Sequence, residues 1–224
     1  MSNEENGWVP PGPSRKAPCP CGSGRKYKKC CLQKRESEAF PVLWPKLNAT
    51  LRELSQTLQE FASDTWGPRY VEHAWDDFWG GDAPVDVGTG PFSSLFATWY
   101  LFHWAPGKAI VLESEPLPLE DTIAAEYLRE HGEGLEPLSR QYLETARLTP
   151  ISFWQVESVV RERGLQMKDL ATGKELFVNE VQATRHAAIW DLMLCKVISV
   201  DGTNVIDGAG PYVMPASAKP MVRE

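Results

Sequence analysis

Four of the chain's five cysteines lie close together near the N-terminus, in the spacing C-x-C-x8-C-C. They are Cys19, Cys21, Cys30 and Cys31. Four thiolates suit Zn²⁺, which takes a tetrahedral set of ligands at Zn–S distances of about 2.3 Å. Gly22 allows a sharp backbone turn beside the first pair. A segment this short has no hydrophobic core, so we expect bound zinc to supply its folding free energy.

Disulfides or idle thiols are the alternative to zinc. Four cysteines can pair in three ways. The adjacent pair Cys30 and Cys31 argues against pairing, and the opening MSNEENGWVP has no basic region followed by an apolar core, so we expect no signal peptide. The spacing also differs from the C-x-x-C of redox motifs.

Residues 18–32, PCPCGSGRKYKKCCL, resemble the SEC-C zinc motif, which is best known from the C-terminal tail of the SecA protein-translocation ATPase. The resemblance implies that the four cysteines are the ligands, although other members often carry His where Cys31 stands. Residues 14–17 depart from the Arg-Asn-acidic run that is usual before the motif. In SecA the motif is a docking tag for a chaperone and the ribosome, so the resemblance implies a protein partner of that class.

Charge separates this segment from the rest of the chain. Residues 1–35 carry a formal +6, which leaves −13 for the remainder of a chain whose net charge is −7. The predicted partner-binding residues are four bases around one aromatic side chain: Arg25, Lys26, Tyr27, Lys28 and Lys29. A basic loop with an exposed aromatic suits an acidic helix, a phosphate backbone or an unstacked base. The alternative is that the bases only offset the charge of a four-thiolate zinc site.

The remaining sequence predicts helices followed by strands. Leucines and a phenylalanine recur at spacings of three and four residues from Leu47 to Phe61, which indicates a helix that ends before Gly67. Further helices are expected over 69–79, 91–104, 121–131 and 135–148. Strands are expected over 151–160, 165–170, 175–178, 192–200 and 204–206, with a hairpin at 171–174.

These elements predict an α+β protein in which a small zinc knuckle is followed by a helical layer and then by a small antiparallel β-barrel or curled sheet. The expected parts are the knuckle with its basic flanks (1–35), a Trp-rich helical region (36–150), a β domain (151–214) and a loose tail (215–224). The helix with Phe96 and Trp99, the strand opening at Ser152 and the hairpin at Gly173 resemble a group of largely uncharacterised bacterial SEC-C proteins. These are packing residues, so this likeness implies no activity.

Catalytic motifs do not stand out. The sequence has no P-loop, G-x-S-x-G, H-E-x-x-H or kinase signature. His73 and Asp77 share a helix face at a metal-compatible spacing, but the acidic run 72–77 is typical of a solvated face. His103, between Phe102 and Trp104, is expected to be a hydrogen-bonded core residue.

The sequence therefore predicts a zinc-binding cytoplasmic adaptor, not an enzyme, whose basic knuckle docks an acidic body onto a ribosome, chaperone or translocation partner. No apolar run reaches the roughly 20 residues of a membrane span. The alternatives are nucleic-acid binding by the knuckle, and an enzyme with a pocket among the tryptophans of the helical layer.

Overall fold

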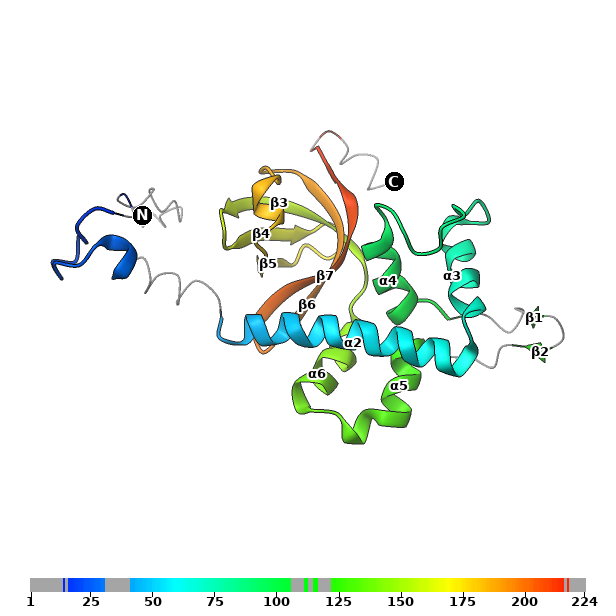
Figure 1. Cartoon of the computed structure of the whole chain (residues 1–224). Coiled ribbons are helices and arrows are strands. Elements are labelled where there is room, and N and C mark those ends of the chain that lie inside the picture. The colour runs from blue at the N-terminus through cyan, green and yellow to red at the C-terminus, as the bar shows by residue number, and fades with distance from the viewer. Residues whose placement is uncertain are drawn as a thin grey trace. The chain divides into compact units, whose positions relative to one another are not determined.

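The computed structural model describes residue 14, residues 16–30, 41–105, 111–112, 115–116 and 122–215, and residue 217. These residues fall into two compact units, Met1–Pro41 and Val42–Glu224. Cys31, residues 32–40 and most of the expected tail lie outside the described residues. Each unit is described by itself below (Figure 1).

The N-terminal unit is a short hairpin closed by a 3-10 helix, η1 (Tyr27–Lys29). An isolated antiparallel bridge joins Pro18 to Lys26, and the Cys19 N–H donates to the Arg25 carbonyl at 2.8 Å. The Tyr27 N–H donates to the Ala17 carbonyl at 2.8 Å. These local bonds fold the described part of the unit back on itself.

The larger unit begins with helices, as the apolar periodicity predicts. The described helices are α2 (Leu43–Trp66), α3 (Arg69–Trp79), α4 (Ser93–Phe102), α5 (Ile123–His131) and α6 (Pro137–Leu148). The larger unit also contains two short 3-10 helices, η2 (Gly132–Gly134) and η3 (Ala183–Arg185). Thr122 caps α5 by accepting from the Ala125 N–H at 3.3 Å, and α6 begins at a proline, which needs no N–H there.

Helix α2 is the long element against which the other helices pack. Its predicted stripe is confirmed, because Leu47, Leu54 and Leu58 are buried. The helix contacts α3, α4, α5, α6 and the sheet (Figure 1). The Trp44 indole N–H donates to the Asn179 carbonyl at 3.0 Å and so fastens the start of α2 to the sheet.

The strands form one five-stranded antiparallel sheet in the order β5-β4-β3-β6-β7. Its strands are β3 (Ser152–Val160), β4 (Gly164–Asp169), β5 (Glu175–Asn179), β6 (Leu192–Val200) and β7 (Thr203–Met214). Two-residue strands β1 (Val111–Leu112) and β2 (Glu115–Pro116) form a separate small ladder that the sequence did not predict.

The sheet is curled and not closed. No ladder joins the edge strands β5 and β7 within the described chain, yet the two strands touch at one end. There the Asn204 side chain donates to the Phe177 carbonyl at 2.8 Å, and the Asn179 side chain donates to the Asn204 carbonyl at 3.3 Å. This arrangement confirms the α+β class and selects the curled sheet over the barrel.

Both faces of β6 are buried, and successive side chains on a strand point to opposite faces, so each face packs into a different core. Ile198, Val200 and Val205 join the helices in one core. Cys195 and Val197 point the other way, into a second core inside the curl. Helices and strands of the larger unit therefore share apolar contacts.

Strand β7 is longer than the expected 204–206. The run from Asp207 to Pro211 contains two glycines and a proline, which are typical of a strand end. The structure instead continues the strand through irregular register between Met193 and Val197 of β6. Gly208 adopts a φ of 85° at this point, which a bulge in an antiparallel pair accommodates.

Candidate metal centre

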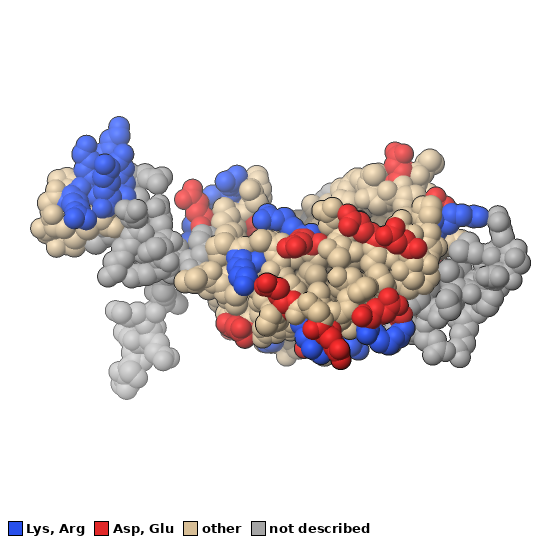
Figure 2. All heavy atoms as spheres, turned by 60° about the horizontal axis from the view of Figure 1, so that its bottom comes forward, with Lys and Arg blue, Asp and Glu red and all other residues tan. Residues whose placement is uncertain are grey.

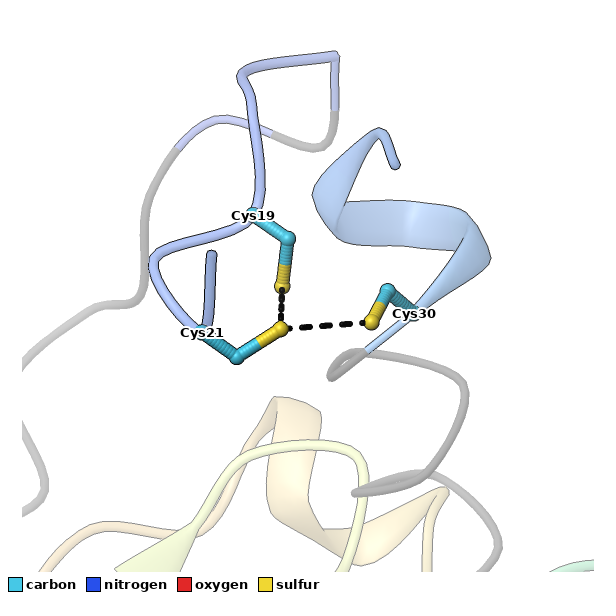
Figure 3. A group of neighbouring side chains, drawn as sticks. All are labelled: Cys19, Cys21 and Cys30. Carbon is cyan, nitrogen blue, oxygen red and sulfur yellow. Dashed lines mark hydrogen bonds between the residues drawn. The ribbon is translucent and has the colours of Figure 1, made fainter. Parts of the chain in front are cut away.

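Three of the four predicted ligands converge in the N-terminal unit. Cys19 and Cys21 lie in the turn of the hairpin, and Cys30 follows η1 (Figure 3). The Gly22 N–H donates to the Cys19 carbonyl at 3.2 Å, and Gly22 has a φ of 77°, so the turn uses the conformational freedom of glycine. The Cys30 N–H donates to the Tyr27 carbonyl at 3.2 Å, which brings the third thiol back toward the first two.

The three sulfur atoms have the spacing of a thiolate metal site. All three lie within 4.8 Å of one another. The Cys21 sulfur is 3.3 Å from that of Cys19 and 3.4 Å from that of Cys30. Sulfurs bound tetrahedrally to zinc at about 2.3 Å lie about 3.8 Å apart, so an outward shift of under about 0.5 Å accommodates the ion.

Hydrogen bonding prepares one of these thiols for metal binding. Bonds from the Ser23 side chain, then its backbone, and then Cys19 and Cys30 lower the pKa of Cys21 to about 6. The Ser23 hydroxyl also lies 3.1 Å from the Cys30 sulfur. Because the thiolate is the form that binds metal, these contacts favour coordination near neutral pH. Ser23 is a functional residue that the spacing argument missed.

Cys31 lies outside the described residues. A soft donor set of three converging sulfurs fits a thiophilic ion such as Zn²⁺. The assignment of Cys31 as the fourth ligand stays a prediction, as do the individual ligand roles of the other three.

The basic side chains beside the thiols are exposed, with Arg25, Lys26, Lys28 and Lys29 all open to solvent. Figure 2 shows the described Lys and Arg side chains of this unit gathered in one patch. Tyr27 differs from expectation, because its side chain is only 5% exposed. The prediction of an exposed aromatic was wrong: the Tyr27 ring packs inside the described part of this unit, where burial of its large apolar surface is favourable.

The other sequence candidates lie in the larger unit and do not converge. Among the described residues, the cysteine cluster is the one group of three or more metal-binding side chains. Glu72, Asp76 and Asp77 are exposed on α3, and the Asp77 carboxylate accepts from the Trp104 indole at 2.9 Å. His73 is half-buried on the same helix.

His103 is partly buried, but its expected hydrogen bond at Nε2 is not found. That nitrogen has no partner among the described residues. Burial first, and then the charge of Lys196, lower the pKa of His103 to about 4, so the ring is neutral at pH 7. The thiol of Cys195 is fully buried, and burial raises its pKa to about 12, which fits its expected place in the core.

A buried charge pair joins the sheet to the helices and was not predicted. The Lys196 ammonium, on a side chain with 0% exposure, lies 3.6 Å from Oδ2 of Asp207, and 3.8 Å from the centre of the Phe102 ring. Thr98 donates to the same carboxylate oxygen at 3.0 Å, and Tyr142 also hydrogen-bonds Asp207. The alternation of side chains along a strand could have indicated that Lys196 is buried, because it places Lys196 on the same face as Ile198.

The local motif defines the class to which this site belongs. Residues 15–33 match the model of the SEC-C motif. The chain thus carries a SEC-C motif, which precedes an α+β unit in the sequence, and the cysteine cluster of the motif is a candidate metal-binding site.

Two relatives match mainly through this segment. "UPF0225 protein SG1365" of Sodalis glossinidius is 81% identical over 21 residues, 9% of this chain and 14% of that protein. "Protein translocase subunit SecA" of Desulforudis audaxviator is 68% identical over 25 residues, 11% of this chain and 3% of SecA.

A third relative matches over a longer stretch. "Uncharacterized protein YccF" of Bacillus subtilis is 29% identical over 171 residues, which is 73% of this chain. The chain spans about two fifths of the length of that relative, 41%. No solved structure matches the chain.

Proposed function

We propose that the protein is a zinc-binding adaptor of the cytoplasm, in which the N-terminal unit docks the acidic body onto a ribosome, chaperone or translocation partner. The observation that carries this proposal is the combination of a thiol cluster with four exposed bases on a unit of its own. The match to a segment of a protein translocase subunit supports the class of partner.

In this proposal Cys19, Cys21, Cys30 and Cys31 hold the zinc, and the ion fixes the loop that carries the bases. Zinc in a closed thiolate site has no open coordination position, so its role is structural. We keep residues 1–35, 36–150 and 151–214 as proposed functional parts, with residues 215–224 as a tail.

The partner surface consists of Arg25, Lys26, Lys28 and Lys29. Four exposed bases on a rigid loop favour association with an acidic protein surface through charge complementarity. Tyr27 contributes by filling the interior of the unit, since its side chain is buried. Nucleic-acid binding is the weaker alternative, because single-stranded recognition relies on exposed aromatic rings and the described part of this unit presents none.

The test compares two charge-matched variants of the full chain in co-purification from native lysate at two salt concentrations. One replaces the four bases of the N-terminal unit by Gln. The control replaces four exposed bases of the body by Gln: Lys46, Arg52, Arg69 and Lys174. Metal analysis of both variants verifies that the zinc site is intact.

We expect a ribosomal, chaperone or translocation partner to be retained by the wild type and the control and lost from the first variant. Equal recovery with both variants would refute the adaptor role of the bases. Nuclease treatment separates the alternatives: a partner that is released by nuclease, and whose binding falls steeply with salt, indicates nucleic-acid binding instead.

A further inference from the structure

A hollow of about 350 Å³ lies between α5 and α6, on the larger unit. The two helices lie next to each other and both pack against α2 (Figure 1). The hollow is lined by two apolar and four charged residues: Ala125, Leu128, Arg129, Arg140, Glu144 and Arg147. Three arginines therefore line one hollow on a body whose formal charge is negative.

The three arginines use only some of their N–H donors in contacts with described residues of the chain. Arg129 pairs with Glu126 of its own helix, and Arg140 Nε donates to Glu144 at 3.0 Å. Arg147 forms no ion pair with a described residue. Each guanidinium has five N–H donors, so most donors around the hollow are available to a ligand. Glu126 is buried behind Arg129, which leaves Glu144 as the one carboxylate in the lining.

We propose that this hollow binds the phosphate group of a small phosphorylated molecule. A phosphate monoester presents three strong acceptor oxygens, and the planar guanidinium donates to such oxygens in pairs. Ala125 and Leu128 supply an apolar wall against which the organic part of the ligand packs. The volume accommodates a phosphate with an attached group of nucleoside size. This site is independent of the metal centre and of the adaptor function.

We expect two substitutions in the lining of the hollow to change phosphate affinity in opposite directions. Arg147→Gln removes the guanidinium that has no protein partner, so we expect phosphate affinity to fall at least about tenfold. Glu144→Gln removes the carboxylate that competes with phosphate for Arg140 and repels the ligand, so we expect tighter binding. Arg52→Gln, an exposed position on α2 outside the hollow, is the matched control and should bind as the wild type does.

The experiment is calorimetric titration of the full chain with inorganic phosphate and, separately, with AMP, at constant ionic strength and millimolar ligand. Circular dichroism verifies that each variant is folded. Tighter binding of AMP than of phosphate assigns the site to a ligand with an organic part, and equal binding assigns it to the phosphate group alone. The proposal is overturned if neither probe binds the wild type, or if Arg147→Gln and Arg52→Gln bind equally well.

Discussion

Replacement of Asp207 by Asn would leave Lys196 as an uncompensated charge between the sheet and the helices. The variant keeps the shape of the side chain and an oxygen that accepts from Thr98, so the change removes mainly the negative charge. Breaking a buried ion pair by removing one partner costs about 3–5 kcal/mol. We expect the free energy of unfolding to fall by about 3 kcal/mol at pH 7, the lower end of that range, because Lys196 can lose its charge by releasing a proton.

The pH dependence of the stability of the Asp207→Asn variant follows from the titration of Lys196. Burial lowers the pKa of Lys196 to about 8 in the wild type, while Asp207 opposes that shift. Without Asp207 the folded-state pKa of Lys196 falls further below the unfolded value of about 10.4. Between these values the unfolded state binds more protons, so stability rises with pH. Over pH 7 to 9 we expect the variant to regain about 1.4 kcal/mol more than the wild type.

The reciprocal variant should respond to pH in the opposite sense. Lys196→Met leaves Asp207, whose pKa burial already raises. A carboxyl with a folded-state pKa above its unfolded value stabilises the fold at low pH, and this stability is lost as the pH rises through the folded-state value. The double variant removes both charges, and we expect it to lie within about 1–2 kcal/mol of the wild type.

The measurement is urea unfolding at pH 7 and pH 9, followed by the fluorescence of the nine tryptophans. An unchanged m value shows that the free energy of unfolding, and not the extent of unfolding, has changed. If Asp207→Asn stays within about 0.5 kcal/mol of the wild type at pH 7, or if the two single losses simply add in the double variant, the pair is not coupled.

Three further predictions concern the metal centre and the edge of the sheet. Replacing Cys19 and Cys21 by Ser should abolish zinc in metal analysis and leave thermal unfolding of the larger unit nearly unchanged; unfolding of both units together would contradict the division into two units. Tyr27→Ala should weaken zinc affinity at least about tenfold in a chelator competition, with Tyr27→Phe close to wild type; equal affinities of the two would show that ring burial is irrelevant. Gly208→Ala should cost about 2–4 kcal/mol in urea unfolding, because its Cβ would lie 2.5 Å from a threonine methyl group of α4 at a φ of +85°. Gly210→Ala, whose Cβ would lie no closer than 3.5 Å to its neighbours, is the control, and equal losses at both glycines would refute the steric argument.

Features set by neighbouring residues were predictable from the sequence. Two cysteines one residue apart, a turn at Gly22 and a returning Cys30 place sulfurs together through bonds within a dozen residues. The leucine stripe of α2 was predictable for the same reason, since its period is that of the helix itself. The glycine at 173, which adopts a φ of 75°, likewise marks the hairpin between β4 and β5.

Features that depend on contacts between distant segments were not predictable. Whether the Tyr27 ring points to solvent or into the interior of its unit depends on how much apolar surface that small unit has to bury. Strand alternation places Lys196 on the face of Ile198, but only the packing of α4 and α6 over the sheet shows that Lys196 and Asp207 form a buried pair. Strand β7 continues past Gly208 because β6 supplies a partner there, although the local sequence favours a strand end.

The sequence alone determined the candidate metal centre, the charge asymmetry and the order of helices and strands, because each is written in residues close along the chain. Only the tertiary structure decided which face of β6 the helices cover, where a buried charge finds its counter-ion and how α5 and α6 bring three arginines around one hollow. The physical reason is that burial and charge pairing are energies of contact, and these contacts join residues that the sequence separates by more than a hundred positions.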